Sequence, residues 1–370
     1  MKFVCDKNQL ITALTNVQGA ISTSAIAALE GFYINTEGER IYIAGYNLEV
    51  GISTVVPARI SRAGAVVLNA ALFLNLVKKL PDDLVEIEVD DKDIAKIRSG
   101  ETEYSIIGIP SDEYPQLPRV PESKTVTIPE KTLKSLVRQT RFAVAKNDAN
   151  PVHTGILFEL ENGKVTAVAV DGYRLAMAVE DIVWEQYTRF IIPERALSEV
   201  MKMLRDDSID PVTIEIGPRN VLFEVGQYSY VTRLLDGEFL DYRSAIPTSH
   251  KTTVEVSTRA ITELMDRITP IISDKLKSPV RCIFSDDRIK ASCSTAIGTA
   301  SDRIPARTDG ERVEIGFNNR YMLEALKACE SDEIRIMLGG ALSPMKIVPK
   351  EGDSFLFLVL PVRLKTETNQ

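Results

Sequence analysis

The sequence repeats one arrangement of elements three times, and this repeat restricts the possible fold more than any other feature. Each copy begins with a short β-branched stretch, a helix start signal and an apolar stripe at helical spacing. These openings are MKFVCDKNQLITALTNVQGAIS from Met1, VTIPEKTLKSLVRQTRFAVAKN from Val126 and VEVSTRAITELMDRITPIISD from Val254. Their helix start signals are Asp6, Pro129-Glu130 and Ser257. Equivalent segments lie roughly 120–130 residues apart, so the chain is one domain written three times.

A second pattern follows in each third, in which a strand leads into a helix, an acidic turn and an alternating strand. The three copies are AVVLNAALFLNLVKKLPDDLVEIEV from Ala65, RFIIPERALSEVMKMLRDDSIDPVTIEI from Arg189 and RVEIGFNNRYMLEALKACESDEIRIML from Arg312. We predict an α+β fold with two helices and about eight strands per domain, the helices packed on antiparallel sheets. The predicted domains are 1–122, 123–248 and 249–370, with Pro-, Ser-, Thr- and Lys-containing linkers near 121–124 and 248–251.

Positive charge is concentrated in the predicted helices. The chain of 370 residues has a net charge of −8, which taken alone argues against an anionic partner. The six predicted helical windows nevertheless carry +9 together, so the other residues must carry −17. These windows are 6–20, 69–80, 130–146, 194–205, 257–277 and 318–327.

The third and fourth windows place basic residues beside an apolar stripe. Their basic residues are Lys131, Lys134, Arg138, Arg141, Lys146, Arg195, Lys202 and Arg205, of which the first four are spaced 3, 4 and 3 residues apart. Window six adds Arg320. The apolar stripes are Leu133, Leu136, Val137, Thr140 and Val144, and Leu197, Val200 and Leu204. For any single helix, a solvated face is the simpler interpretation. Several such helices in tandem favour a track for phosphates that reads no base sequence, because no aromatic residues interleave with the cations.

The sequence offers little material for catalysis. His153 and His250 are its two histidines, and it contains no phosphate-binding, dinucleotide-binding, zinc-protease or nucleophile-elbow motif. The acidic run 90–93 lies between two alternating stretches and is predicted to be a turn, and the four cysteines have no metal-ligand spacing. We therefore expect no enzyme activity, no cofactor and no metal. No apolar run is long enough for a membrane span, so we expect a cytoplasmic protein.

The repeat and four ordered motifs resemble the bacterial sliding clamp family, the beta subunit of the replicative DNA polymerase. The motifs are VDGYRLA at 170–176, LLDGEFLDY at 234–242, IGFNNRYMLEAL at 315–326 and LPVRL at 360–364. The resemblance spans nearly the whole chain. It implies a ring-shaped head-to-tail homodimer with sheets outside and helices lining a hole that encloses duplex DNA. In such a dimer, domain 1 of one protomer contacts domain 3 of the other, and the matching residues are Tyr104, Ile106, Ile271 and Ile272.

The resemblance also implies a pocket between domains 2 and 3. It would bind short peptide motifs of the replicative polymerase catalytic subunit, the clamp loader and repair polymerases. The matching positions are His153, Val170, Gly172, Tyr173, Arg174, Leu175, Leu240, Ala245, Asn318, Tyr321, Leu342, Pro344, Met345, Leu358, Leu360, Val362 and Arg363. Among them we expect Arg174 and Arg363 to orient peptide carbonyls or carboxylates.

Several positions depart from the family pattern. His153, Val170, Leu240 and Ser244 stand where leucine, threonine, proline and arginine are common, the loop 19–29 has no basic residue or proline, and 365–370 extends past the usual end. Two alternatives to a processivity clamp stay open, and the altered pocket residues motivate the first of them. One is a specialised relative that acts mainly as a peptide-binding scaffold, and the other is a nucleic-acid enzyme.

Overall fold

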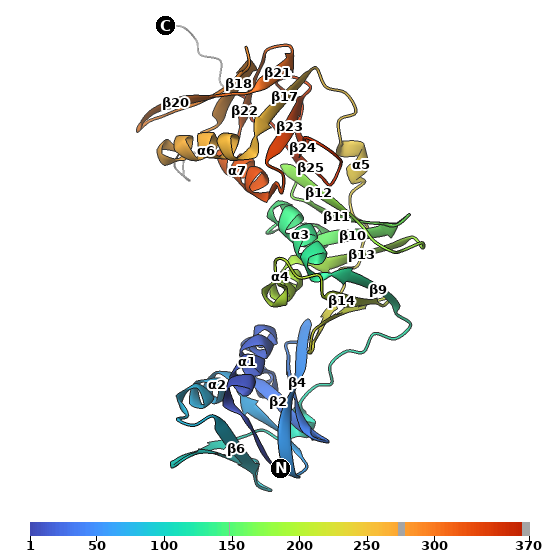
Figure 1. The fold of residues 1–370 in the computed structure, drawn as a ribbon, viewed down its shortest axis with the longest axis vertical. Coiled ribbons are helices and arrows are strands. Elements are labelled where there is room, and N and C mark those ends of the chain that lie inside the picture. Colours follow the sequence, from blue (N-terminus) through green and yellow to red (C-terminus); the bar gives the residue numbers. More distant parts are fainter. Residues whose placement is uncertain (148, 273–277, 365–370) are drawn as a thin grey trace. The chain divides into compact units, whose positions relative to one another are not determined.

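The computed structural model describes residues 1–147, 149–272 and 278–364 (Figure 1). The chain divides into two compact units, and each is described by itself. The first unit comprises Met1–Leu133 and Arg195–Leu234. The second unit comprises Lys134–Glu194 and the chain from Leu235 onward.

The first unit contains a 12-stranded antiparallel sheet among its described residues. Its main path runs β8-β7-β6-β1-β4-β16-β15-β14-β9, and β3, β2 and β5 branch from β4. The strands of the first repeat are β1 (Lys2–Asp6), β2 (Gly31–Glu37), β3 (Arg40–Tyr46), β4 (Val50–Arg62), β5 (Ala65–Asn69), β6 (Leu84–Val89), β7 (Ile94–Ser99) and β8 (Thr102–Ile107). The second repeat contributes β9 (Lys124–Pro129), β14 (Pro211–Ile216), β15 (Asn220–Val225) and β16 (Tyr228–Arg233). The pairing of β4 with β16 therefore makes one continuous sheet from two repeats.

The helices of the first unit begin at short polar side chains that accept backbone hydrogen bonds. Asp6 caps α1 (Lys7–Val17) by accepting from the Gln9 amide at 2.8 Å, as its place in the sequence predicts. Asn69 caps α2 (Ala70–Lys79) in the same way. These two helices pack against each other, and α1 also packs on β3 and β4 (Figure 1). The next helix, α4 (Glu194–Met203), buries Ala196, Leu197 and Val200.

The second unit contains a 9-stranded and a 4-stranded antiparallel sheet among its described residues, with the orders β13-β10-β11-β12-β25-β24-β23-β17-β21 and β20-β19-β18-β22. The second repeat supplies β10 (Gly155–Glu161), β11 (Lys164–Val170), β12 (Arg174–Asp181) and β13 (Thr188–Pro193). The third repeat supplies β17 (Thr252–Ser257), β18 (Val280–Ser285), β19 (Arg288–Thr295), β20 (Gly298–Pro305), β21 (Arg307–Gly310), β22 (Val313–Phe317), β23 (Glu333–Leu338), β24 (Met345–Pro349) and β25 (Phe355–Val359).

Two long helices of the second unit belong to the third repeat and pack together. They are α6 (Thr258–Ile268), capped by Ser257, and α7 (Asn319–Ala328), capped by Asn318. A short helix, α5 (Tyr242–Ala245), precedes β17. The helix α3 (Glu130–Thr140) begins in the first unit and continues in the second.

The predicted threefold repeat is confirmed element by element. Each repeat runs strand, helix, four strands, helix and three strands, and the third differs by splitting the counterpart of β4 into β20 and β21. The largest differences from the predicted helix bounds are at the ends of α3 and α6. The helix α3 ends at Thr140, whose hydroxyl donates to the Leu136 carbonyl at 2.7 Å, and Arg141 belongs to a following 3₁₀ turn. The helix α6 ends before Pro270, which cannot donate a backbone hydrogen bond, and the rest of that predicted helix, 273–277, lies outside the described residues.

Candidate functional site

A tight turn between β11 and β12 positions the candidate peptide pocket in the second unit. The Asp171 carboxylate accepts from the backbone amides of Tyr173 at 3.0 Å and Arg174 at 3.1 Å. Gly172 has φ 80°, a conformation that costs a residue with a side chain about 1 kcal/mol or more. The turn leaves Tyr173 60% exposed while Arg174 enters β12 and is buried. The sequence VDGYRLA therefore encodes a specific backbone shape.

The buried side chain of Arg174 connects the turn to α7. Its side chain is 6% exposed, its Nε donates to Asp171 at 2.9 Å, and its guanidinium also pairs with Glu324 of α7. The guanidinium lies over the rings of Tyr321 at 4.5 Å and Phe142 at 5.5 Å. Through these contacts Arg174 positions the turn against α7, and its expected role in orienting a peptide stays a prediction.

The apolar residues predicted for the pocket form a buried group, called the floor, and an exposed group, called the rim. The floor comes from the paired strands β12 and β25, in which Leu175 is opposite Leu358, with Val170 beside them. The exposed predicted residues are Gly172, Tyr173, Leu240, Ala245, Leu342, Leu360, Val362 and Arg363. The Leu360 amide donates to the Tyr173 carbonyl at 2.9 Å, and the rings of Tyr173 and Tyr321 stack at 5.8 Å. The structure thus brings the turn, the last strand and α7 together.

Other predicted pocket residues have different surroundings. Met345 is fully buried opposite Val359. The Asn318 side chain caps α7 by accepting from the Arg320 amide at 3.0 Å. His153 is half-buried, and its ring meets Phe239 edge to face at 5.5 Å. Pro344 is half-buried in the loop before β24.

The sequence prediction missed the residues that support the pocket from below. Phe239 and Tyr242 belong to the same buried cluster as Val170, Leu175 and Leu358, and the apolar spacing in FLDY was the available signal. The Tyr242 hydroxyl donates to Glu159 at 2.6 Å, and burial together with this contact raises the pKa of Tyr242. Glu159 is 2% exposed, and Arg243 also donates to it, at 2.8 Å. No pattern in the sequence marks Glu159, because β10 also carries Glu161 and nothing in the sequence shows which of the two is buried.

The predicted basic residues of the second unit are exposed or half-buried, and several are ion-paired. Arg138 lies 2.9 Å from Glu330, and Arg141 lies 3.2 Å from Glu194. Arg320 lies 3.8 Å from Glu324. Lys134 is half-buried, whereas Lys146 is exposed beyond the 3₁₀ turn. The basic face therefore exists, but acidic neighbours reduce its charge.

The basic residues of the first unit are Lys131, Arg195, Lys202 and Arg205, and all are exposed. Lys202 pairs with Glu199 at 2.6 Å. Arg205 has a structural role as well, because its amide donates to Glu130 at 2.7 Å and its guanidinium donates at 2.8 Å. Glu130 is 3% exposed, and these hydrogen bonds hold its pKa below the ordinary value. Within the described residues, Lys131 and Arg195 have no ion-pair partner.

Each unit exposes apolar residues where the sequence predicts a protomer contact. In the first unit, β8 is the edge strand of its sheet and carries Tyr104 and Ile106, both half-buried, on one face. The sequence prediction missed its neighbour Ile107, which is 83% exposed. In the second unit, Ile271 and Ile272 are half-buried just after α6. An open edge strand with an exposed isoleucine is typical of a strand that pairs with another chain.

The acidic run and the cysteines are structural. The Asp90 carboxylate accepts from the Lys92 and Ile94 amides and forms the turn between β6 and β7, as predicted. Cys5, Cys282 and Cys293 are buried free thiols. Within the described residues, no group of three or more His, Cys, Asp or Glu could hold a metal. No helix in the same part of the chain is long and apolar enough to cross a membrane.

Comparisons with known proteins give one consistent answer. Family models of the DNA polymerase III beta subunit match residues 1–118 (N-terminal domain), 127–241 (central domain) and 243–363 (C-terminal domain). The beta sliding clamps of Bacillus subtilis and Halalkalibacterium halodurans are 34% and 31% identical to this chain, over 98% of it and 100% of each relative.

Solved structures agree with the sequence matches. The DNA polymerase sliding clamp of B. subtilis has a TM-score of 0.96 at 32% identity, with 99% of this chain and 100% of that chain covered. A putative DNA polymerase III beta subunit from Eubacterium rectale has a TM-score of 0.94 at 28% identity, with 98% and 99% covered. The chain therefore belongs to the DNA polymerase III beta subunit family, the sliding clamps, and contains all three clamp domains in tandem.

Proposed function

We propose that the protein is a DNA polymerase processivity factor, two copies of which close head to tail into a ring around duplex DNA. The observation that carries this proposal is the match of all three clamp domains over nearly the whole chain. We place the domain boundaries at 1–122, 123–248 and 249–370. The protein would act by enclosing DNA and holding partners on it, without catalytic activity of its own and in the cytoplasm.

The basic residues would face the enclosed duplex and contact its phosphates without reading bases. The proposed contact residues are Lys131, Lys134, Arg138, Arg141, Lys146, Arg195, Lys202, Arg205 and Arg320. Three observed ion pairs, those of Arg138, Arg141 and Lys202, support weak and diffuse contacts. A cation that exchanges a carboxylate for a phosphate gains little free energy, so no position along the duplex is strongly favoured. Enclosure would keep the ring on DNA while these exchanges allow it to slide.

The pocket of the second unit would hold the partner proteins. Its rim offers Tyr173, Leu240 and Leu360 to apolar side chains, and Arg363 offers a positive charge for a carboxylate. Backbone hydrogen bonds and Arg174 hold the turn in shape before a peptide arrives, which reduces the entropy lost on binding. We propose that peptides of the replicative polymerase, the clamp loader and repair polymerases bind here.

The two copies would meet through the exposed edge strand β8 and the segment after α6. Tyr104 and Ile106 of one protomer would then cover Ile271 and Ile272 of the partner copy. Such a contact joins two different surfaces, and it closes into a ring when two protomers complete the rotation.

Polymerase stimulation on primed circular DNA tests this function directly. We expect the protein, added with a clamp loader and polymerase of the same family, to lengthen the products made in one binding event. A matched variant, Leu360→Asp, should still load but lose the stimulation, because a charge would stand in the apolar rim. If the protein binds polymerase peptides but never lengthens products, it is a peptide-binding scaffold and the proposal is wrong.

A further inference from the structure

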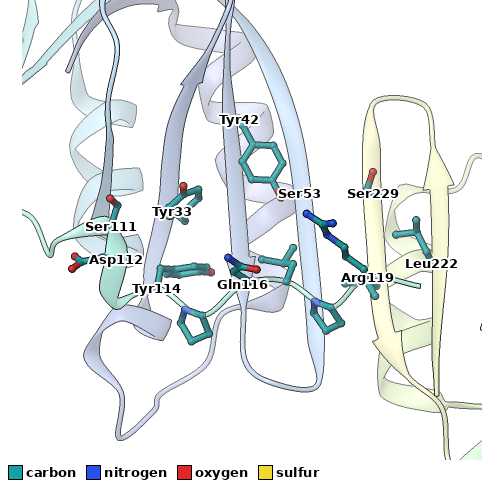
Figure 2. A pocket seen from close by; sticks show the side chains of 14 residues that line it. Tyr33, Tyr42, Ser53, Ser111, Asp112, Tyr114, Gln116, Arg119, Leu222 and Ser229 are labelled. Atoms are coloured by element: carbon teal, nitrogen blue, oxygen red, sulfur yellow. The ribbon is translucent and has the colours of Figure 1, made fainter. Parts of the chain in front are cut away.

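The first unit contains a cavity of about 680 Å³ that the family match does not assign. It lies where β4 of the first repeat pairs with β16 of the second, beside the segment 111–119 that follows β8 (Figure 2). Tyr33, Tyr42 and Tyr114 line one side, and Figure 2 shows Arg119 reaching toward Ser53 from the other. Its volume falls within the ~300–1,000 Å³ typical of ligand sites.

The strand register relates this cavity to the pocket region of the second unit. In the first unit, Ser53 of β4 is opposite Ser229 of β16. In the second unit, Met177 of β12 is opposite Leu356 of β25. Because β4 and β16 hold the same places in their repeats as β12 and β25, each serine corresponds to one of these large apolar residues.

The turn that starts each strand supports the same correspondence. The Asn47 side chain accepts from the backbone amides of Glu49 at 3.1 Å and Val50 at 2.8 Å, as Asp171 does in its own turn. Leu48 follows with φ 72°, close to the 80° of Gly172. A leucine in this conformation is strained, which shows that the surrounding structure maintains the turn shape without a glycine.

The residues at this register position differ in size between the two sites. Met177 and Leu356 pack against the buried cluster of the second unit. Ser53 and Ser229 each have two fewer non-hydrogen side-chain atoms, which leaves more room at this position, and both line the cavity. Beside Gly51 the space is occupied instead, because a Cβ there would lie 3.0 Å from Val231 and 3.1 Å from Leu117, both of which line the cavity.

The open space is lined by groups that suit a peptide with an aromatic and an acidic side chain. The rings of Tyr33 and Tyr114 lie 5.2 Å apart and those of Tyr33 and Tyr42 lie 6.3 Å apart, which forms an aromatic wall. The Tyr114 hydroxyl is buried and makes no hydrogen bond within the described residues. Arg119 is exposed, and in the same part of the chain it has no ion-pair partner.

We propose that this cavity is a second peptide-binding site, which takes a short segment of a partner protein with an aromatic side chain next to a carboxylate. The aromatic side chain would pack on the tyrosine wall above Ser53 and Ser229, and the carboxylate would accept hydrogen bonds from Arg119. Arg119 supplies the charge complementarity for this occupant. The site stands independently of the pocket in the second unit, because the two share no residue.

Ligand-observed ¹⁹F NMR with the full-length protein tests the site. The probe is the peptide acetyl-Leu-(4-fluoro-Phe)-Asp-amide, and its control has Asn in place of Asp. All proteins carry Leu360→Asp to weaken binding in the second unit. We expect the probe to bind this background, and Ser53→Met with Ser229→Leu to weaken it at least about tenfold by filling the cavity.

Arg119→Gln provides a second test that does not depend on refilling the interior. It should weaken the Asp probe about fivefold and leave the Asn probe unchanged, whereas Arg233→Gln, an exposed arginine on β16 outside the cavity, should change neither. The proposal is overturned if the Leu360→Asp protein does not bind the Asp probe. It is also overturned if this protein binds the Asp probe equally well with Arg119 and with Arg119→Gln. If the filling variant fails to fold by circular dichroism, the Arg119 result decides.

Discussion

Replacing Arg174 with methionine should loosen the proposed peptide pocket without unfolding the rest of the protein. Methionine keeps much of the side-chain volume but removes the charge. The change leaves Asp171, which is 13% exposed, and Glu324, which is 38% exposed, without their shared cation. It also removes the contacts with Tyr321 and Phe142.

The size of the effect follows from burial. Removing one partner of a buried ion pair costs about 3–5 kcal/mol. Two features reduce that value here, because Asp171 keeps its two backbone hydrogen bonds and Glu324 is partly in water. The lost cation–π contact adds about 0.5–1 kcal/mol. We therefore expect the local free energy of opening to fall by about 3 kcal/mol and peptide affinity to fall at least about tenfold.

Native-state hydrogen exchange measures this opening at a suitable amide. The Leu360 amide donates to Tyr173 in the turn, so its protection reports on the turn directly. The matched control is Arg320→Met, since Arg320 is 62% exposed and lies 3.8 Å from the same Glu324. That exposed pair should contribute less than about 1 kcal/mol. Equal loss of protection in the two variants would refute the positioning role of Arg174.

Three further predictions concern other parts of the molecule. Arg205 lowers the pKa of Glu130, so the Glu130 carboxylate stabilises the fold above the ordinary glutamate pKa of about 4.3. This stabilisation is lost as pH falls through the lowered pKa. The difference in unfolding free energy between wild type and Glu130→Gln should therefore be constant near pH 7 and shrink toward pH 3. Ile271→Asp with Ile272→Asp should give folded monomers in analytical ultracentrifugation, and a surviving dimer would remove these residues from the interface. Binding to circular DNA should weaken, with an unchanged circular dichroism spectrum, when glutamate replaces four exposed cations, Arg138, Arg141, Arg195 and Lys202. Full binding by this variant would argue against a basic lining. Arg205 is left out of that set, because a carboxylate there would face buried Glu130.

The sequence predicts the fold well because its repeat constrains every element three times. Asp6 and Ser257 cap helices where expected, and the stripe from Leu133 to Val144 is buried. The helix ends were harder to predict. Pro270 lacks the amide that would continue α6, although the apolar pattern runs past it, and no sequence signal marks the end of α3 at Thr140.

The candidate site is less fully encoded in local patterns. The motif VDGYRLA identifies the turn, but only the structure shows that Arg174 faces inward and pairs with Glu324, 150 residues later. The cavity of the first unit was not predicted at all. It depends on the register that places Ser53 opposite Ser229, and no motif in either strand reveals a pairing between residues so distant in the chain.

The central claim is that two copies of this chain enclose duplex DNA, and retention on closed and cut circles tests it most directly. The protein would be loaded onto a nicked circular plasmid, separated from free protein by gel filtration, and followed after a restriction enzyme linearises the DNA. Enclosure predicts long retention on the circle and rapid loss from the cut ends. Equal retention on both forms would mean that the protein holds DNA by surface contacts, and would contradict the account.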